Sequence, residues 1–279
     1  MDCQLKDITV HYEMLGEGRP IIMLHGWSLD HRHMVSDMEP LFRQNNGWKR
    51  IYLDLPGHGR TPGKDWITNQ DKILDVVLDF IDNVISGQRF VVVGASAGAY
   101  LARGVVHHRS ASIDGLLLIV PLIVADDTKR HVPTHVTLVA DSALASKLEP
   151  DEAEGLFQIA VVQSRKVVDY IRANFLPASE IGDQAFQSKI RDCPENYAFS
   201  FAMDALPEPF LAPMLIVTGR QDSIVGYNDA YEILESYPRG TFAVLDRAGH
   251  FASVEQEDLF HALAGEWLDR VEEYAGGFR

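Results

Sequence analysis

Three residues of this chain have side chains that could together perform nucleophilic catalysis. Ser96 lies between two glycines in the pattern Gly-x-Ser-x-Gly, and Asp222 and His250 each follow an apolar run. A serine hydroxyl is a weak nucleophile at neutral pH, so it needs a base within hydrogen-bond reach, and that base needs a carboxylate to orient it. The chain therefore contains candidates for all three members of such a set, in the order Ser96, Asp222, His250, and their chemistry would be acyl transfer.

The residues around Ser96 strengthen this interpretation. Residues 90–93 form an apolar run that is typical of a strand buried on both faces of a parallel sheet. Residues 97–108 are small residues and helix formers. A sharp turn from strand to helix strains the residue at the turn, and flanking glycines avoid collisions there. The sequence therefore predicts that the Ser96 hydroxyl projects above a sheet, although the five-residue pattern alone is also compatible with a flexible turn.

The elements that must position these residues alternate along the chain. Buried strands are expected near 21–24, 51–55, 90–93, 116–120, 214–218 and 241–245, after an antiparallel edge strand within 4–14. Helices are expected at 68–85, 97–108, about 228–236 and 254–274. This alternation predicts an α/β fold with a mostly parallel sheet flanked by helices, whose site lies at the carboxyl ends of the strands. The polar candidates all follow strands: His25, Asp54, Ser96, Asp222 and His250.

Residues 122–208 interrupt the alternation. They contain helix-like stretches at about 151–173 and 185–191, and no buried strand paired with a following helix. We therefore expect a core domain made of 1–121 and 209–279, and a mainly helical cap inserted at 122–208.

The sequence resembles the α/β-hydrolase fold enzymes over nearly its whole length, and the resemblance is weakest in the cap. The resemblance is carried by His25-Gly26-Trp27, the stretch Asp-Leu-Pro-Gly-His-Gly-Arg-Thr at 54–61, the Ser96 motif, Gly-Arg-Gln-Asp at 219–222 and Gly-His at 249–250. It implies that Ser96 is the nucleophile, His250 the general acid and base, and Asp222 the orienting acid.

The resemblance also implies an oxyanion hole made by the backbone N–H groups of Trp27 and Ala97. Two fixed donors aimed at a developing negative oxygen each lower the activation barrier by about 3 kcal/mol. Candidates for the pocket around them are His25, Gly26, Tyr100 and Phe251.

Other interpretations of the same residue types remain open. Asp126 or Asp127, which follow the 116–120 strand, could supply the acid in place of Asp222. His58 lies in a loop that is usually structural in this fold, so a catalytic role is disfavoured.

Two groups of histidines could suggest a metal site. His31 and His33, with His25 nearby, would lie on opposite sides of a helix, and no cysteine or glutamate set accompanies them. His131 and His135 have helical spacing, but a proline at 133 lies between them. We therefore expect no metal and no cofactor.

Composition limits the partners and the compartment. The formal net charge is −15, from 40 acidic against 25 basic residues, which argues against binding to nucleic acid or to anionic membranes. Cys3 and Cys193 are the only cysteines, and we expect a reducing, cytoplasmic location with neither a signal peptide nor a membrane span. Oligomeric state cannot be inferred from the sequence.

These features lead us to expect a serine hydrolase that cleaves a carboxylic ester of a small molecule through an acyl-enzyme. Alternatives with the same triad are a carbon–carbon bond hydrolase and a cofactor-free perhydrolase. From another class, a ligand receptor could retain the fold and triad, because fold does not determine function. A dehalogenase or an epoxide hydrolase would need an aspartate where Ser96 stands.

Overall fold

The computed structural model describes residues 1–43 and 45–277, which form an eight-stranded sheet in the order β1-β2-β4-β3-β5-β6-β7-β8. The β1–β2 and β2–β4 pairs are antiparallel, and every later pair from β4 to β8 is parallel. The strands are β1 (Asp2–Gln4), β2 (Thr9–Leu15), β3 (Arg19–Leu24), β4 (Trp48–Leu53), β5 (Phe90–Ala95), β6 (Ile113–Ile119), β7 (Met214–Gly219) and β8 (Gly240–Leu245).

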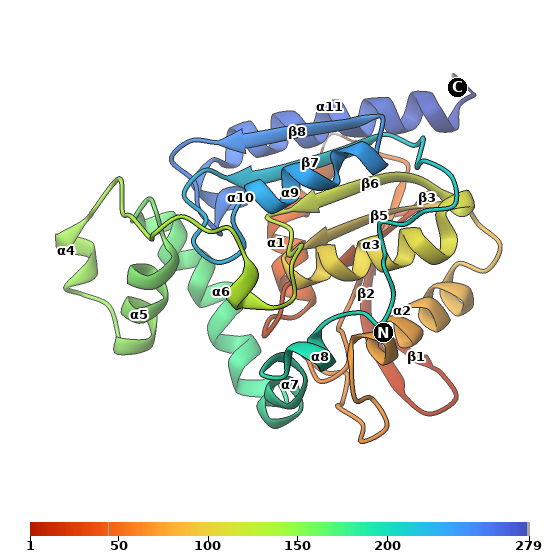
Figure 1. Ribbon diagram of the computed structural model, residues 1–279. Coiled ribbons are helices and arrows are strands. Elements are labelled where there is room, and N and C mark those ends of the chain that lie inside the picture. Colours follow the sequence, from red (N-terminus) through yellow and green to blue (C-terminus); the bar gives the residue numbers. More distant parts are fainter. Residues whose placement is uncertain (44, 278–279) are drawn as a thin grey trace.

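The central strands are buried on both faces. Every residue of β5, β6 and β7 is buried, as their continuous apolar runs predict. In β2 the buried residues Val10 and Tyr12 alternate with partly exposed ones, as expected of a strand near the edge. Helices α1 and α11 contact each other and cover one face of the sheet, while α2 and α3 cover the other (Figure 1).

The helices, in chain order, are α1 (His31–Phe42), α2 (Gln70–Val84), α3 (Ala97–Arg109), α4 (Ser142–Ala145), α5 (Pro150–Ile159), α6 (Arg165–Ile181), α7 (Gln184–Arg191), α8 (Pro194–Tyr197), α9 (Asn228–Glu232), α10 (Ala252–Glu255) and α11 (Glu257–Ala275). The α/β fold with a mostly parallel sheet and flanking helices is confirmed. Helix α2 begins after Asn69, whose side chain accepts a hydrogen bond from the Lys72 amide, as an N-cap should.

Several features differ from the sequence-based expectations. The edge strand expected within 4–14 is divided between β1 and β2, and the helix expected at 254–274 is divided into α10 and α11 at Gln256. Helix α1 was not expected as an element; it begins after Asp30, whose side chain accepts from the Arg32 amide, and it contains Pro40. The stretch at 151–173 is not one helix, because residues 160–164 separate α5 from α6. Within this break, Val162 forms an isolated parallel β-bridge with Val139.

The segment between β6 and β7 contains α4 to α8. Figure 1 shows α4 and α5 projecting beyond the edge of the sheet. A small second core joins this segment to the rest of the protein, because Val168, Tyr170 and Ile171 of α6 pack with Phe251 and Val254. Over the described residues, none of the helices has the length and apolar character needed to cross a membrane.

Candidate active site

Ser96 occupies a sharp turn between β5 and α3. Its backbone has φ 52° and ψ −118°, a strained combination for a residue with a side chain, worth about 1–3 kcal/mol. The flanking glycines are required sterically: a Cβ on Gly94 would lie 2.3 Å from the Gly98 carbonyl oxygen, and one on Gly98 would lie 2.1 Å from that of Leu24. The Ser96 amide donates to the carbonyl of Ile119 at 2.9 Å, which ties the turn to the end of β6.

The structure brings Ser96, His250 and Asp222 together from three strand ends. His250 Nε2 lies 3.1 Å from Ser96 Oγ, and His250 Nδ1 lies 2.9 Å from Asp222 Oδ2. Asp222 is fully buried, and its other oxygen accepts from the amides of Ile224 and Val225 at 2.8 and 3.0 Å. A neutral imidazole with its proton on Nδ1 satisfies both contacts, and this is the tautomer that a general base for serine requires.

The alternative acids take other positions. Asp126 caps a short turn, where it accepts from Thr128 and pairs with Lys129. Asp127 lines the outer part of the pocket described below. The contact with His250 Nδ1 is made by Asp222.

The loop after β3, residues 25–27, lies beside the turn of Ser96. A Cβ built on Gly26 would be 3.5 Å from Ser96 Cβ, so the loop passes in van der Waals contact with the serine. Within residues 1–43 and 45–277, the amides of Trp27 and Ala97 have no hydrogen-bond acceptor, so both remain available to an anionic oxygen. Their role as the oxyanion hole stays a prediction.

Two buried histidines hold this loop. His25 donates from Nδ1 to the Gly26 carbonyl at 2.7 Å and accepts at Nε2 from the Leu55 amide at 3.0 Å. His33 accepts at Nδ1 from the Gly26 amide at 3.2 Å. Burial lowers the pKa of His25 to about 4 and that of His33 to about 3, so both rings are neutral acceptors at pH 7.

The sequence analysis did not predict that His33 would support this loop, because it treated His33 only as a possible metal ligand. Its helical spacing from His31 was the available signal, because it places the two rings on opposite sides of α1. His31 accordingly bonds to Asp54, whereas His33 reaches Gly26, so His25, His31 and His33 do not converge on a common point.

His58 has a structural position, as expected. Its Nδ1 lies 2.9 Å from the Pro56 carbonyl, and its ring packs edge-on against that of Trp27 with centroids 4.8 Å apart. Burial lowers the pKa of His58 to about 3. Residues 131–136 are not helical, and His131 instead bonds to Asp229 at 2.6 Å.

A second missed residue is Glu255, which supports the loop of His250. One of its carboxylate oxygens accepts from the Gly249 amide at 2.6 Å. The other accepts from the amides of Val161 and Val162, in the break between α5 and α6. Because Val161 and Val162 lie 94 and 93 residues from Glu255 in the chain, no local pattern could have indicated this role.

Two adjoining cavities open onto Ser96 and His250, and Trp27 and Phe175 line both. The inner one has a volume of about 60 Å³, and its further lining residues are Gly26, Leu29, His33, Val120, Tyr170 and Phe251. The outer one is open and measures about 590 Å³. Its wall includes Ile159, Arg191 and Tyr197 from the segment between β6 and β7.

Two of the four pocket candidates lie at the cavity wall and two do not. Gly26 and Phe251 line the inner cavity. His25 lies behind the loop, and Tyr100 stacks on Phe199, with ring centroids 4.6 Å apart, and accepts from its amide. In the described part of the chain, neither residue lines the two cavities, so the expectation that His25 and Tyr100 form the pocket needs correction. Their side chains are occupied in supporting the loop and the core.

Comparisons with known proteins agree with this architecture. The model of the alpha/beta hydrolase family matches residues 21–263. The crystal structure of an alpha/beta superfamily hydrolase from Oenococcus oeni PSU-1 superposes with a TM-score of 0.84 at 27% identity, over 98% of this chain and 99% of that one.

Relatives of similar length show a range of activities. The AB hydrolase superfamily protein YisY of Bacillus subtilis (strain 168) is 26% identical over 93% of this chain and 95% of its own. A pimeloyl-(acyl-carrier protein) methyl ester esterase of Legionella pneumophila (strain Paris) is 21% identical over 94% and 100%. A 2-hydroxy-6-oxononadienedioate/2-hydroxy-6-oxononatrienedioate hydrolase of Pseudomonas putida is 23% identical over 94% and 92%. With the family model matched over most of its length and the whole fold in common, the chain belongs to the alpha/beta hydrolase family.

Proposed function

We propose that this protein is a serine hydrolase that cleaves carboxylic esters of small molecules through an acyl-enzyme. The observation that carries the proposal is the continuous relay from Ser96 Oγ through His250 to the buried Asp222, at the floor of a cavity. The esterase among the relatives supports the same reaction type.

In the first half-reaction, Ser96 Oγ attacks the ester carbonyl carbon while His250 Nε2 takes the hydroxyl proton. The carbonyl oxygen becomes an anion, which the amides of Trp27 and Ala97 stabilise; removing one such donor costs about 10²–10³ in rate. When the tetrahedral intermediate collapses, the C–O bond of the ester breaks and His250 gives its proton to the departing alcohol. A water activated by His250 then releases the acid and restores Ser96.

The shape of the two cavities suggests how a substrate lies. The inner cavity is small and lined by Leu29, Val120 and Phe251, which suits a short acyl chain. The outer cavity is wider and carries charged side chains at its wall, which suits a larger and more polar alcohol part. Residues 122–208 act as the cap in this proposal, because they supply much of the outer wall. The two separate thiols, Cys3 and Cys193, are consistent with a cytoplasmic location.

Carbon–carbon bond hydrolysis is the second candidate, and the Pseudomonas putida relative is the observation that favours it. It would use the same triad, with a carbon leaving group in place of an alcohol. A perhydrolase would use hydrogen peroxide in place of water at the second step. A ligand receptor would bind its ligand yet turn it over very slowly.

The test is steady-state hydrolysis of p-nitrophenyl esters from C2 to C12 by wild type, Ser96→Ala and Ser110→Ala. Ser110 lies exposed at the far end of α3 and serves as a matched control. We expect turnover with a short-chain optimum that Ser96→Ala abolishes and Ser110→Ala preserves. Turnover that persists in Ser96→Ala would refute the mechanism. A wild type that is silent on every ester, but cleaves a vinylogous diketone, would favour the second candidate.

A further inference from the structure

A polar groove adjoins the outer cavity, where the end of α6 and α7 meet the loop after β3. Its volume is about 260 Å³, and Ser28 and Arg191 line both the groove and the outer cavity. Polar side chains of α6 and α7 supply most of the remaining wall, among them Ser179, Gln187 and Ser188. A substrate held at the triad therefore has a polar space into which its alcohol part can extend.

Ser28 has a fixed position at the junction of the groove and the outer cavity. Its φ of 61° is uncommon for a residue with a side chain. Ser28 Oγ donates to Gln187 Oε1 at 3.0 Å, and Gln187 Nε2 donates to the Gly57 carbonyl at 2.9 Å. Because Gln187 is buried, this chain of hydrogen bonds sets the orientation of the Ser28 hydroxyl before a ligand arrives.

The hydrogen bonds already made determine which groups remain for a ligand. A serine hydroxyl has one hydrogen and two lone pairs. Ser28 gives its hydrogen to Gln187, and Ser179 gives its own to a backbone carbonyl of α6, so both oxygens are left as acceptors. Arg191 is bonded to Asp192 through Nε at 3.0 Å, and its two terminal nitrogens carry further N–H donors. The groove therefore combines acceptors with donors.

The charges favour a neutral ligand over an ion. Two cations, Arg130 and Arg191, and two anions, Asp127 and Asp192, line the outer cavity. The guanidinium of Arg130 is already bonded to three backbone carbonyls, and Arg191 is paired with Asp192. Because neither sign of charge is in excess, a carboxylate or an ammonium group on the substrate would gain little net attraction.

We propose that this groove binds the alcohol part of the ester and that this alcohol is a neutral polyol or sugar. Each hydroxyl of such a group both donates and accepts, which matches a wall of serine oxygens and guanidinium N–H groups. An alkyl group of the same size would cover these polar groups without replacing their bonds to water, which costs free energy. With the small inner cavity, the groove defines the substrate as a short-chain acyl ester of a polyol or sugar. This inference rests on the proposed function and names its substrate class.

The test compares two acetate esters whose alcohol parts share one ring size. 6-O-acetyl-D-glucose carries hydroxyls on its ring, whereas cyclohexylmethyl acetate has a ring without them. Release of acetic acid in a pH-stat gives kcat and KM for each ester. We expect kcat/KM to be at least about tenfold higher for the sugar ester, mainly through a lower KM, because the groove contacts are made before the chemical step.

Two variants locate this preference in the groove. Arg191→Met removes the donors while keeping a long side chain, and Ser28→Ala removes the acceptor at the junction. Each should reduce the ratio of the two kcat/KM values at least about threefold. Both esters carry the same acetyl group, so damage to the triad or to the loop lowers both rates together and leaves the ratio unchanged. Lys189→Met is the matched control, because Lys189 is an exposed cation of α7 that is absent from the described walls of the groove and the outer cavity.

A wild-type preference that falls in both groove variants and persists in Lys189→Met would support the inference. A ratio near one in a wild type that cleaves both esters, or a ratio unchanged in both groove variants, would overturn it while leaving ester hydrolysis in place. If wild type cleaves neither ester, the proposed function fails, and saturation-transfer NMR on Ser96→Ala measures binding without turnover. Tighter binding of the sugar ester would then still support the groove, and equal or absent binding would refute it.

Discussion

The proposed triad depends on a carboxylate, Asp222, that is removed from water and fully hydrogen-bonded. Asp222 gives one oxygen to His250 and the other to two backbone amides, so its orientation is fixed before substrate arrives. A carboxylate held in this way selects the tautomer of His250 and stabilises the imidazolium that forms during attack.

Replacing this carboxylate should therefore damage the chemistry more than the fold. In Asp222→Asn, the amide can donate to His250 Nδ1 and favour the wrong tautomer, so we expect kcat to fall by roughly 10³–10⁴ with a small change in KM. Steady-state kinetics check the rate, and thermal unfolding checks that the variant is folded. A loss of less than tenfold would mean that Asp222 does not orient the base.

His33 accepts a hydrogen bond from the Gly26 amide next to Trp27, so we expect it to position the loop that we propose forms the oxyanion hole. We expect His33→Ala to lower kcat roughly tenfold or more, with KM little changed, since the oxyanion forms only in the transition state. His33→Asn, which keeps an acceptor near the position of Nδ1, should restore part of the rate. Equal losses in both variants, or a change confined to KM, would contradict this role.

At the scale of elements, helix α1 links the loop of residues 25–27 to a buried carboxyl. Asp37 lies one turn after His33, with its Oδ2 3.5 Å from His33 Nε2, and Tyr170, Ser253, Glu257, His261 and Lys166 surround it. Burial raises the pKa of Asp37 to about 7, above the value of 3.8 for an unperturbed aspartate.

This shift predicts how stability depends on pH. Between about pH 4 and pH 7 the folded chain holds a proton on Asp37 that the unfolded chain has lost, so the free energy of unfolding falls as pH rises through this window. Asp37→Asn should flatten this slope and raise stability at pH 8 by up to about 4 kcal/mol, the cost of ionising a buried carboxyl whose pKa is raised from 3.8 to about 7. Urea unfolding at pH 5 and pH 8 measures both quantities, with the exposed Asp79→Asn as the control. Parallel slopes for wild type and Asp37→Asn would show that another group is responsible.

Elements with a strong local pattern were predictable from the sequence, and tertiary partnerships were not. The apolar runs of β5, β6 and β7 gave their positions, and the two glycines around Ser96 indicated the turn. For three residues of the site region, His33, Glu255 and Tyr100, no local pattern identified the partner. Their partners are Gly26, the 161–162 amides and Phe199, and which of these a side chain meets depends on how distant segments pack.

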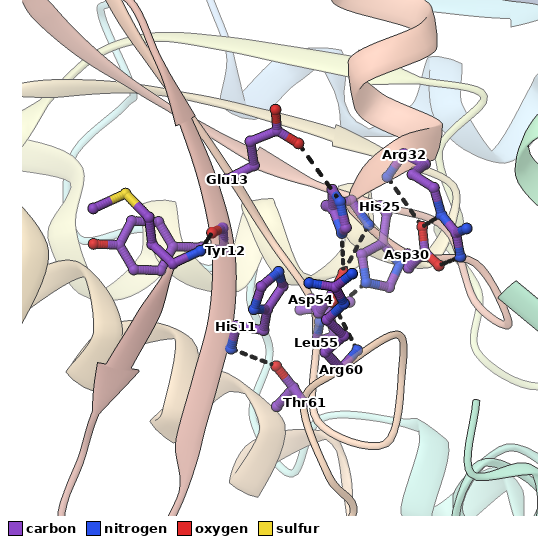
Figure 2. Close-up of polar contacts among 12 residues, drawn as sticks. His11, Tyr12, Glu13, His25, Asp30, Arg32, Asp54, Leu55, Arg60 and Thr61 are labelled. Carbon is purple, nitrogen blue, oxygen red and sulfur yellow. Dashed lines mark hydrogen bonds and ion pairs between the residues drawn. The ribbon is translucent and has the colours of Figure 1, made fainter. Parts of the chain in front are cut away.

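The cluster of His11, His31 and Asp54 illustrates the same limit. Short-range spacing pairs His31 with His33, whereas the fold brings His31, the first residue of α1, to His11 of β2 and to Asp54 after β4 (Figure 2). Only the antiparallel register of β2 on β4, in which Tyr12 lies opposite Leu53, places the side chains of His11 and Asp54 in one region.

At the scale of the whole molecule, the segment between β6 and β7 is connected to the triad at two points. Glu255 joins the 161–162 amides to the loop of His250, and Phe175 of α6 packs against Phe251 with ring centroids 5.5 Å apart. The same segment therefore shapes the cavity and supports the base.

Phe175 should accordingly set the length of the acyl chain. Because it lines both cavities, Phe175→Ala is expected to move the optimum of the ester series to chains longer by about two to four carbons, at a cost in stability of about 2–4 kcal/mol. Phe157→Ala is the control, since Phe157 is exposed on α5. An unchanged optimum in Phe175→Ala would place the acyl chain elsewhere.

The most direct test of the serine mechanism is covalent labelling by a fluorophosphonate, followed by intact mass and peptide mapping. We expect one adduct per chain, on Ser96, absent in Ser96→Ala and formed at least 100-fold more slowly in His250→Ala. An adduct on another residue, or labelling of Ser96→Ala at the rate of wild type, would contradict the assignment of Ser96 as the activated nucleophile.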